Sequence, residues 1–121
     1  MPIRKIMVVD DSPTERLSLQ ELLTRNGYQV ITAEGGEEAV TRSKTELPDL
    51  ILMDVVMPGM NGYQATRTIS RSETTREIPI IMCTSKGQET DKIWGMRQGA
   101  FAYLVKPVDH EELLARIRAL G

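Results

Sequence analysis

The chain has 121 residues, of which 40% are hydrophobic and 26% are charged, and its 15 basic and 17 acidic residues give a formal charge of -2. These values are typical of a globular protein and predict a single domain over residues 1–121. Basic residues are interleaved with acidic ones, which argues against a nucleic-acid-binding face. The N-terminal apolar run is too short for a signal sequence or membrane insertion, so we expect a cytoplasmic protein and, by default, a monomer.

Short apolar runs alternate with longer amphipathic segments along the chain, in the order βαβαβαβαβα. This alternation predicts an α/β fold in which helices cover both faces of a parallel sheet. The expected strands are mostly continuous apolar runs, as is typical of strands that are buried on both faces. They comprise residues 5–9, 29–33, 50–53, 80–83 and 102–105. Cys83, the single cysteine, ends the fourth run and is expected to be a small buried side chain.

Capping signals and apolar spacing predict a helix after each strand. The first helix should begin directly after Asp11, because Ser12-Pro13-Thr14-Glu15 combines a capping box with proline at the first helical position, and Gly27 should close it. The others are expected over residues 37–46 before Pro48, from a cap at Asn61, over about residues 88–98 before Gly99, and after the capping signal of Asp109 and Glu112.

Acidic, hydroxyl and basic side chains stand where the expected strands end. They are Asp10 and Asp11 after the first strand, Asp54 after the third, Thr84 after the fourth and Lys106 after the fifth. Alone, each has an ordinary explanation, such as an aspartate that caps a turn or a solvated lysine. Because ligands of open α/β sheets bind beyond the carboxyl ends of the strands, their joint position predicts one site at one sheet edge.

The expected site combines a cation requirement with a possible nucleophile. Carboxylates about 4 Å apart repel one another by roughly 4 kcal/mol per pair at an effective dielectric near 20, so the cluster needs a cation. Oxygen ligands favour Mg²⁺ over zinc, and the only histidine, His110, should face the solvent at a helix start. An aspartate can also form an acyl phosphate, with Mg²⁺, Lys106 and Thr84 neutralising the phosphoryl oxygens at Asp54.

Four motifs, at residues 8–12, 52–62, 84–85 and 103–107, occur in an order that resembles the response-regulator receiver domains of the CheY type. The resemblance covers essentially the whole chain. It implies a flavodoxin-like, doubly wound (βα)5 fold whose parallel strands have the order 2-1-3-4-5.

The same resemblance implies the chemistry of the site. A histidine kinase of the CheA type would phosphorylate Asp54, and the protein would act as a signalling phosphoacceptor rather than as an enzyme. Mg²⁺ would be bound by Asp10, Asp11, Asp54 and the backbone carbonyl of Val56.

The resemblance also assigns roles to the fourth and fifth strand ends. Lys106 would contact the phosphoryl group, and the peptide bond between Lys106 and Pro107 would be cis. Thr84 and Tyr103 would form a switch that reshapes the face of the fourth helix, fifth strand and fifth helix, where a downstream protein would dock. The chain would thus be a stand-alone response regulator, either an output switch or a phosphate sink.

Two further segments, residues 64–67 and 88–100, resemble PilH-type regulators of type IV pilus twitching motility, which indicates that pathway. The second segment contains Trp94, which is either partly buried on the fourth helix or part of an interface.

Three other functions remain open at this point. One is a scaffold that keeps the fold but is never phosphorylated, although clustered like charges give such a scaffold no obvious benefit. Another is a phosphatase of the haloacid dehalogenase type, but its second aspartate stands two positions after the first, whereas Asp10 and Asp11 are adjacent. The third is a flavin carrier, whose phosphate loop would be rich in serine and threonine.

Two positions near the expected phosphoacceptor predict slow self-dephosphorylation. Val56 and Lys86 replace polar or acidic residues that orient an attacking water in many relatives, and an apolar side chain cannot hold that water. The half-life of the phosphorylated protein tests this expectation. Loss of the phosphoryl group within seconds, without a phosphatase, would contradict it.

Overall fold

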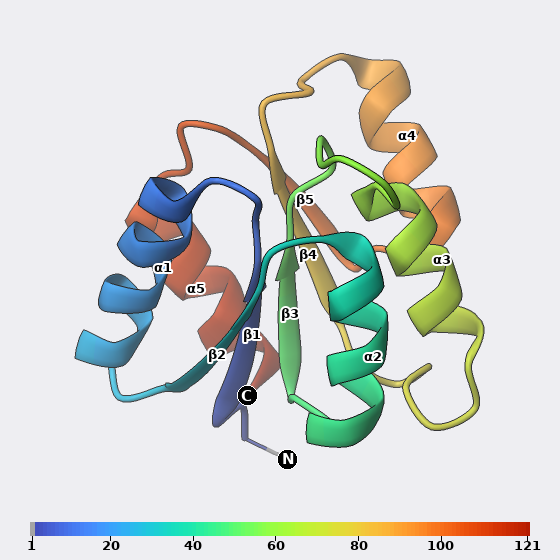
Figure 1. Cartoon of the computed structure of the whole chain (residues 1–121). Coiled ribbons are helices and arrows are strands. Elements are labelled where there is room, and N and C mark those ends of the chain that lie inside the picture. The colour runs from blue at the N-terminus through green and yellow to red at the C-terminus, as the bar shows by residue number, and fades with distance from the viewer. Residues whose placement is uncertain (1) are drawn as a thin grey trace.

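Each apolar run of the sequence forms a strand, and the strands assemble into one parallel sheet (Figure 1). The computed structural model describes residues 2–121. Its strand order, β2-β1-β3-β4-β5, confirms the expected fold. The strands are β1 (Lys5–Val9), β2 (Gln29–Ala33), β3 (Leu50–Met53), β4 (Ile80–Thr84) and β5 (Ala102–Val105).

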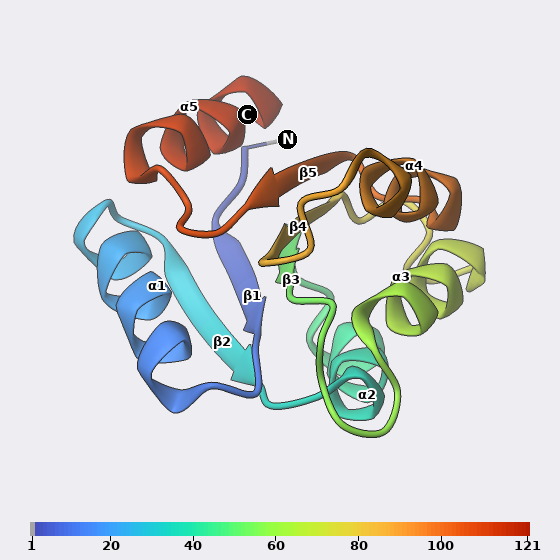
Figure 2. The ribbon, with the colours of Figure 1, turned by 90° about the horizontal axis from the view of Figure 1, so that it is seen from above.

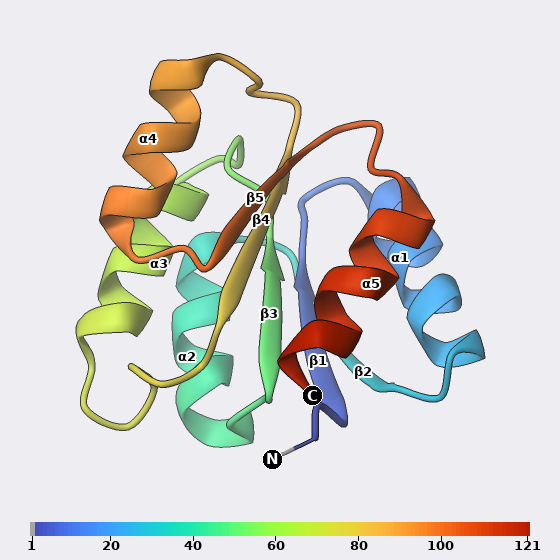
Figure 3. The ribbon, with the colours of Figure 1, turned by 180° about the vertical axis from the view of Figure 1, so that it is seen from behind.

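Five helices cover the two faces of the sheet, so the fold is doubly wound. Figure 2 shows α1 and α5 on one face and α2, α3 and α4 on the other. From behind, α5 crosses the face that it shares with α1 (Figure 3). The helices are α1 (Pro13–Arg25), α2 (Gly36–Glu46), α3 (Gly62–Arg71), α4 (Glu89–Gln98) and α5 (His110–Leu120).

The two faces have separate apolar cores because successive side chains of a strand point to opposite sides. In β1, Ile6 and Val8 belong to the core beneath α1 and α5, whereas Met7 and Val9 belong to the core beneath α2 and α3. With both faces of the central strands buried, charged groups are confined to the strand ends. No helix within residues 2–121 is both long and apolar enough to cross a membrane.

Most element boundaries agree with the sequence, but two boundaries and one helix cap differ. Strand β4 includes Thr84, which pairs with Val105, and α2 begins one residue before the expected Glu37. The capping box at the start of α1 is only half formed. The Ser12 hydroxyl accepts a hydrogen bond from the Glu15 backbone N–H at 3.3 Å, but the Glu15 carboxylate turns to Lys106 instead of returning to Ser12.

Cys83 lies in the core, as expected. Its side chain is buried, and this burial raises the pKa of the thiol to about 12, which keeps it protonated and unreactive at neutral pH.

The loop that carries the third strand end depends on a glycine. Gly62 opens α3 directly against the backbone of Asp54 and Val55. A Cβ atom at this position would lie 2.8 Å from the Val55 Cα and would contact the Asp54 carbonyl oxygen even more closely. Since both neighbours are backbone atoms, the loop would have to move to admit a side chain.

We predict that Gly62→Ala lowers the free energy of unfolding by about 1–3 kcal/mol, the usual cost of overpacking. The matched control is Gly35→Ala, because a Cβ there meets nothing within 4 Å and the φ angle is -164°. The control has no clash to relieve, and its cost should stay below about 1 kcal/mol, the part due to alanine being a poorer helix cap than glycine. Urea denaturation measures both values. Equal losses in the two variants would contradict the role of the close approach.

Candidate functional site

The predicted site residues meet at the carboxyl-terminal edge of the sheet. Asp10 and Asp54 directly follow β1 and β3 and are 2% and 7% exposed, and Thr84, at the end of β4, is fully buried. Lys106 directly follows β5. The neighbouring strands β1, β3, β4 and β5 therefore each contribute to one site, as the sequence predicted.

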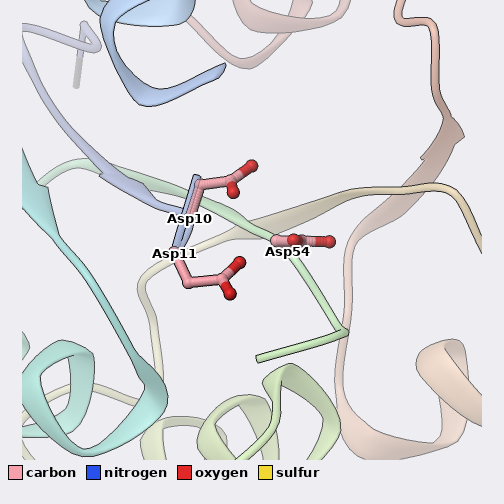
Figure 4. Close-up of side chains that lie close together, drawn as sticks. All are labelled: Asp10, Asp11 and Asp54. Carbon is pink, nitrogen blue, oxygen red and sulfur yellow. The ribbon is translucent and has the colours of Figure 1, made fainter. Parts of the chain in front are cut away.

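Three carboxylates form the acidic part of the site. One oxygen each of Asp10, Asp11 and Asp54 lies within 4.8 Å of the other two. Figure 4 shows the three side chains extending to the same side from the ends of β1 and β3. Asp11 is exposed whereas the other two are buried, so one side of the cluster is open to solvent. An all-oxygen group of this kind fits a hard divalent cation such as Mg²⁺.

Burial and charge make ionisation of Asp54 costly. Desolvation and then the nearby charge of Asp10 raise the pKa of Asp54 above its ordinary value. Lys106 and the Val55 backbone N–H, which donates to Asp54 Oδ1 at 2.8 Å, oppose part of that rise. The second oxygen, Oδ2, faces the Lys106 ammonium at 3.6 Å.

Lys106 supplies the positive charge. Its Nζ donates to Asp10 Oδ2 at 2.9 Å and to the carboxylate of Glu15. Burial alone would lower the pKa of Lys106, but these hydrogen bonds outweigh it and raise the pKa, so the ammonium stays charged. The following bond, from Lys106 to Pro107, is cis, the isomer expected from the resemblance.

Sequence reasoning missed Glu15 as part of the site. Its spacing from Ser12 indicated a capping partner, and no local pattern could show that Lys106, from the other end of the chain, would reach its carboxylate.

The two residues expected to form a switch both bond to the backbone of Lys86. The Lys86 N–H donates to Thr84 Oγ1 at 3.3 Å, and the Tyr103 hydroxyl donates to the Lys86 carbonyl at 2.7 Å. The Tyr103 ring is half-buried against α4, where a Cβ on Gly95 would lie 2.8 Å from it. The hydroxyl of Tyr63, a residue that the sequence analysis did not single out, lies 3.4 Å from that of Tyr103.

The two positions predicted to slow dephosphorylation stand beside this site. The side chain of Val56 is 57% exposed, and the Lys86 ammonium pairs with Asp91 at 3.7 Å. His110 is exposed at the start of α5, as expected.

Comparison with known proteins confirms the family resemblance expected from the sequence. The sequence matches the response regulator receiver domain family over residues 6–118. It is 53% identical over 116 residues to protein PilH of Pseudomonas aeruginosa, covering 96% of each chain.

Two solved structures share the fold over nearly their full length. The chemotaxis protein CheY4 of Vibrio cholerae superimposes with a TM-score of 0.91 at 32% identity, over 98% of this chain and 99% of the other. The receiver domain of the sensor histidine kinase PA1611 of P. aeruginosa, which has a magnesium ion coordinated in its active site cleft, gives a TM-score of 0.89 at 32% identity, over 96% and 95%.

The raised pKa of Asp54 predicts that Asp54→Asn stabilises the fold at pH 7 in the absence of divalent cations. A carboxyl group with a higher pKa in the folded than in the unfolded state favours folding when protonated, and this contribution is lost as the pH rises through the folded pKa. Asparagine keeps the shape without the charge, so the free energy of unfolding should rise by on the order of 1 kcal/mol.

The gain should shrink below about pH 4, because the Asp54 carboxyl then becomes protonated in the unfolded state as well as in the folded state. Urea unfolding at the two pH values, with a chelator present, measures the effect. Glu73→Gln removes one exposed acidic charge and should change stability by less than about 0.5 kcal/mol. A loss of stability in Asp54→Asn at pH 7, or an equal gain at both pH values, would contradict the prediction.

Proposed function

The chain belongs to the response regulator receiver domain family, and from this membership we propose that it accepts a phosphoryl group on Asp54 from a histidine kinase. Receiver domains are signalling proteins of phosphorelays. The observation that carries the assignment is the setting of Asp54, a buried carboxylate with Asp10 and Asp11 on one side and the Lys106 ammonium 3.6 Å away.

In the proposed reaction, a carboxylate oxygen of Asp54 attacks the phosphorus atom of the donor. The bond from phosphorus to the histidine nitrogen breaks, and an acyl phosphate forms. Lys106 is close enough to Asp54 to neutralise charge on the phosphoryl oxygens. Thr84 is the last residue of the neighbouring strand β4, and its buried hydroxyl would donate a hydrogen bond to one of the phosphoryl oxygens.

Receiver domains bind Mg²⁺ at their acidic site, and the oxygen ligands of this chain fit that ion. When bound, Mg²⁺ supplies positive charge to the phosphoryl oxygens. We propose that Asp10, Asp11, Asp54 and the backbone carbonyl of Val56 hold it.

Receiver domains dock with downstream proteins, and the output of this chain would run through Thr84 and Tyr103. Their shared contact with the Lys86 backbone supports this proposal, because a movement of the Thr84 hydroxyl changes the surroundings of Tyr103. Trp94 on α4 is 48% exposed, which favours the interface role over the buried one. The docking face would comprise α4, β5 and α5.

The pathway that we propose is type IV pilus twitching motility. Its support is the 53% identity to PilH over nearly the full length of both chains, together with the resemblance of residues 64–67 and 88–100 to PilH-type regulators. Action as a stand-alone cytoplasmic protein, and as a monomer, stays a prediction.

We predict that acetyl phosphate and Mg²⁺ add one phosphoryl group to the wild-type protein and none to Asp54→Asn. Asparagine has no anionic oxygen to attack phosphorus, and its shape is nearly unchanged. Intact mass spectrometry measures the modification. A chelator should abolish it in the wild type, because the carboxylate cluster then repels the anionic donor.

Phosphorylation of Asp54→Asn would show a different acceptor, and failure of the wild type would favour the scaffold. The same two proteins also test the pathway. In a twitching bacterium that lacks its own PilH, the wild type should restore surface movement and Asp54→Asn should not.

A further inference from the structure

The Lys106 ammonium is shared by three carboxylates, one of which has no part in the proposed reaction. Asp10 and Glu15 accept hydrogen bonds from Nζ, whereas Asp54 is an ion-pair partner at the longer distance of 3.6 Å. Asp10 belongs to the acidic cluster and Asp54 is the phosphoacceptor. Glu15 comes from the first turn of α1 and has so far no role.

We propose that Glu15 is a positioning residue that competes with the phosphoryl group for Lys106 and thereby slows phosphorylation of Asp54. This inference rests on the proposed function, because it requires that Lys106 contacts the phosphoryl group.

The competition follows from the donors of Lys106. An ammonium has three protons, and Asp10 and Glu15 accept two of the hydrogen bonds. A phosphoryl group on Asp54 adds several oxygens that are strong hydrogen-bond acceptors. Asp10 and Glu15 hold the ammonium 3.6 Å from Asp54 Oδ2, which is longer than a hydrogen bond. A close approach of Lys106 to a phosphoryl group on Asp54 therefore draws the ammonium away from Glu15, and the cost of weakening that hydrogen bond opposes phosphorylation. In addition, the negative charge of Glu15 would repel an anionic phosphodonor.

Glu15 is the acceptor that can give way. Its side chain is 45% exposed, whereas that of Asp10 is 2% exposed and is held by the Ser12 backbone N–H at 2.9 Å. Among residues 2–121, the carboxylates placed to share one metal ion are those of Asp10, Asp11 and Asp54, and Glu15 is not one of them. A cation held by those three would compete with Lys106 for Asp10 but not for Glu15.

The cap of α1 does not need the Glu15 carboxylate. The Ser12 hydroxyl accepts a hydrogen bond from the Glu15 backbone N–H, and the Ser12 backbone N–H donates to Asp10 Oδ1. Removing the charge of Glu15 should therefore leave the helix start intact, so that a change in reactivity is not a consequence of unfolding.

The test is Glu15→Gln, measured in two ways. One is the rate of phosphorylation by acetyl phosphate with Mg²⁺, followed by intact mass, and the other is the affinity for beryllofluoride with Mg²⁺, followed by calorimetry. We expect both to increase, by about two- to fivefold, the range for a partly exposed ion pair. Damage to the structure would lower both values instead.

Two control variants separate the contact from the charge. Glu15→Asp keeps the charge but is too short to hold Lys106 in the same way, so it should also react faster than the wild type. Glu21→Gln removes an exposed charge further along α1 and should leave the rate unchanged.

An unchanged or slower Glu15→Gln would overturn the inference. So would a Glu15→Asp that behaves as the wild type, because the effect would then come from charge alone. If the wild type neither gains a phosphoryl group nor binds beryllofluoride, the proposed function fails, and the inference with it. A reactive wild type with an unresponsive Glu15→Gln leaves the proposed function standing.

Discussion

The mutual repulsion of Asp10, Asp11 and Asp54 is the constraint on which the site depends. Oxygens of all three lie within 4.8 Å of one another, two of the side chains are buried, and burial strengthens the repulsion. Because apolar cores cover both faces of the sheet, charged side chains are confined to the ends of the central strands, and the fold concentrates these charges at one edge. Such an edge attracts cations and resists ionisation of the buried Asp54, whose pKa is raised by desolvation and by the charge of Asp10.

Fixed backbone groups hold this cluster in place, and among residues 2–121 Lys106 is the positive side chain that pairs with Asp54. The Ser12 and Val55 N–H groups donate to Asp10 and Asp54 at 2.9 and 2.8 Å, and Gly62 lets α3 begin against the Asp54 backbone. Lys106 supplies the compensating charge at the end of a four-carbon side chain, which is the kind of group that can change partners. Backbone N–H groups thus position the carboxylates of Asp10 and Asp54, while Lys106 compensates part of their charge.

Sequence alone predicted the elements well because most strands are uninterrupted apolar runs and most helix starts carry local caps. It also placed Asp10, Asp54, Thr84 and Lys106 at one edge, since parallel strands end on the same side. The strand order came from the resemblance, because periodicity does not determine which strands are neighbours. Glu15 and Tyr63 were missed for the same reason: their partners, Lys106 and Tyr103, are distant in sequence, and tertiary contact overrode the local pattern at Ser12.

In the proposed switch, the link from the site to the proposed docking face depends on one short backbone segment. Both polar groups of the Lys86 peptide backbone are engaged, the N–H by Thr84 and the carbonyl by Tyr103. A Thr84 hydroxyl that turned to a phosphoryl oxygen would weaken its bond to the Lys86 N–H, and Lys86 would then be held at its carbonyl by Tyr103. Tyr103 packs against α4 at Gly95, where a larger residue would collide with its ring. The proposed switch would therefore run from Thr84 through the Lys86 backbone to Tyr103 and the surface of α4.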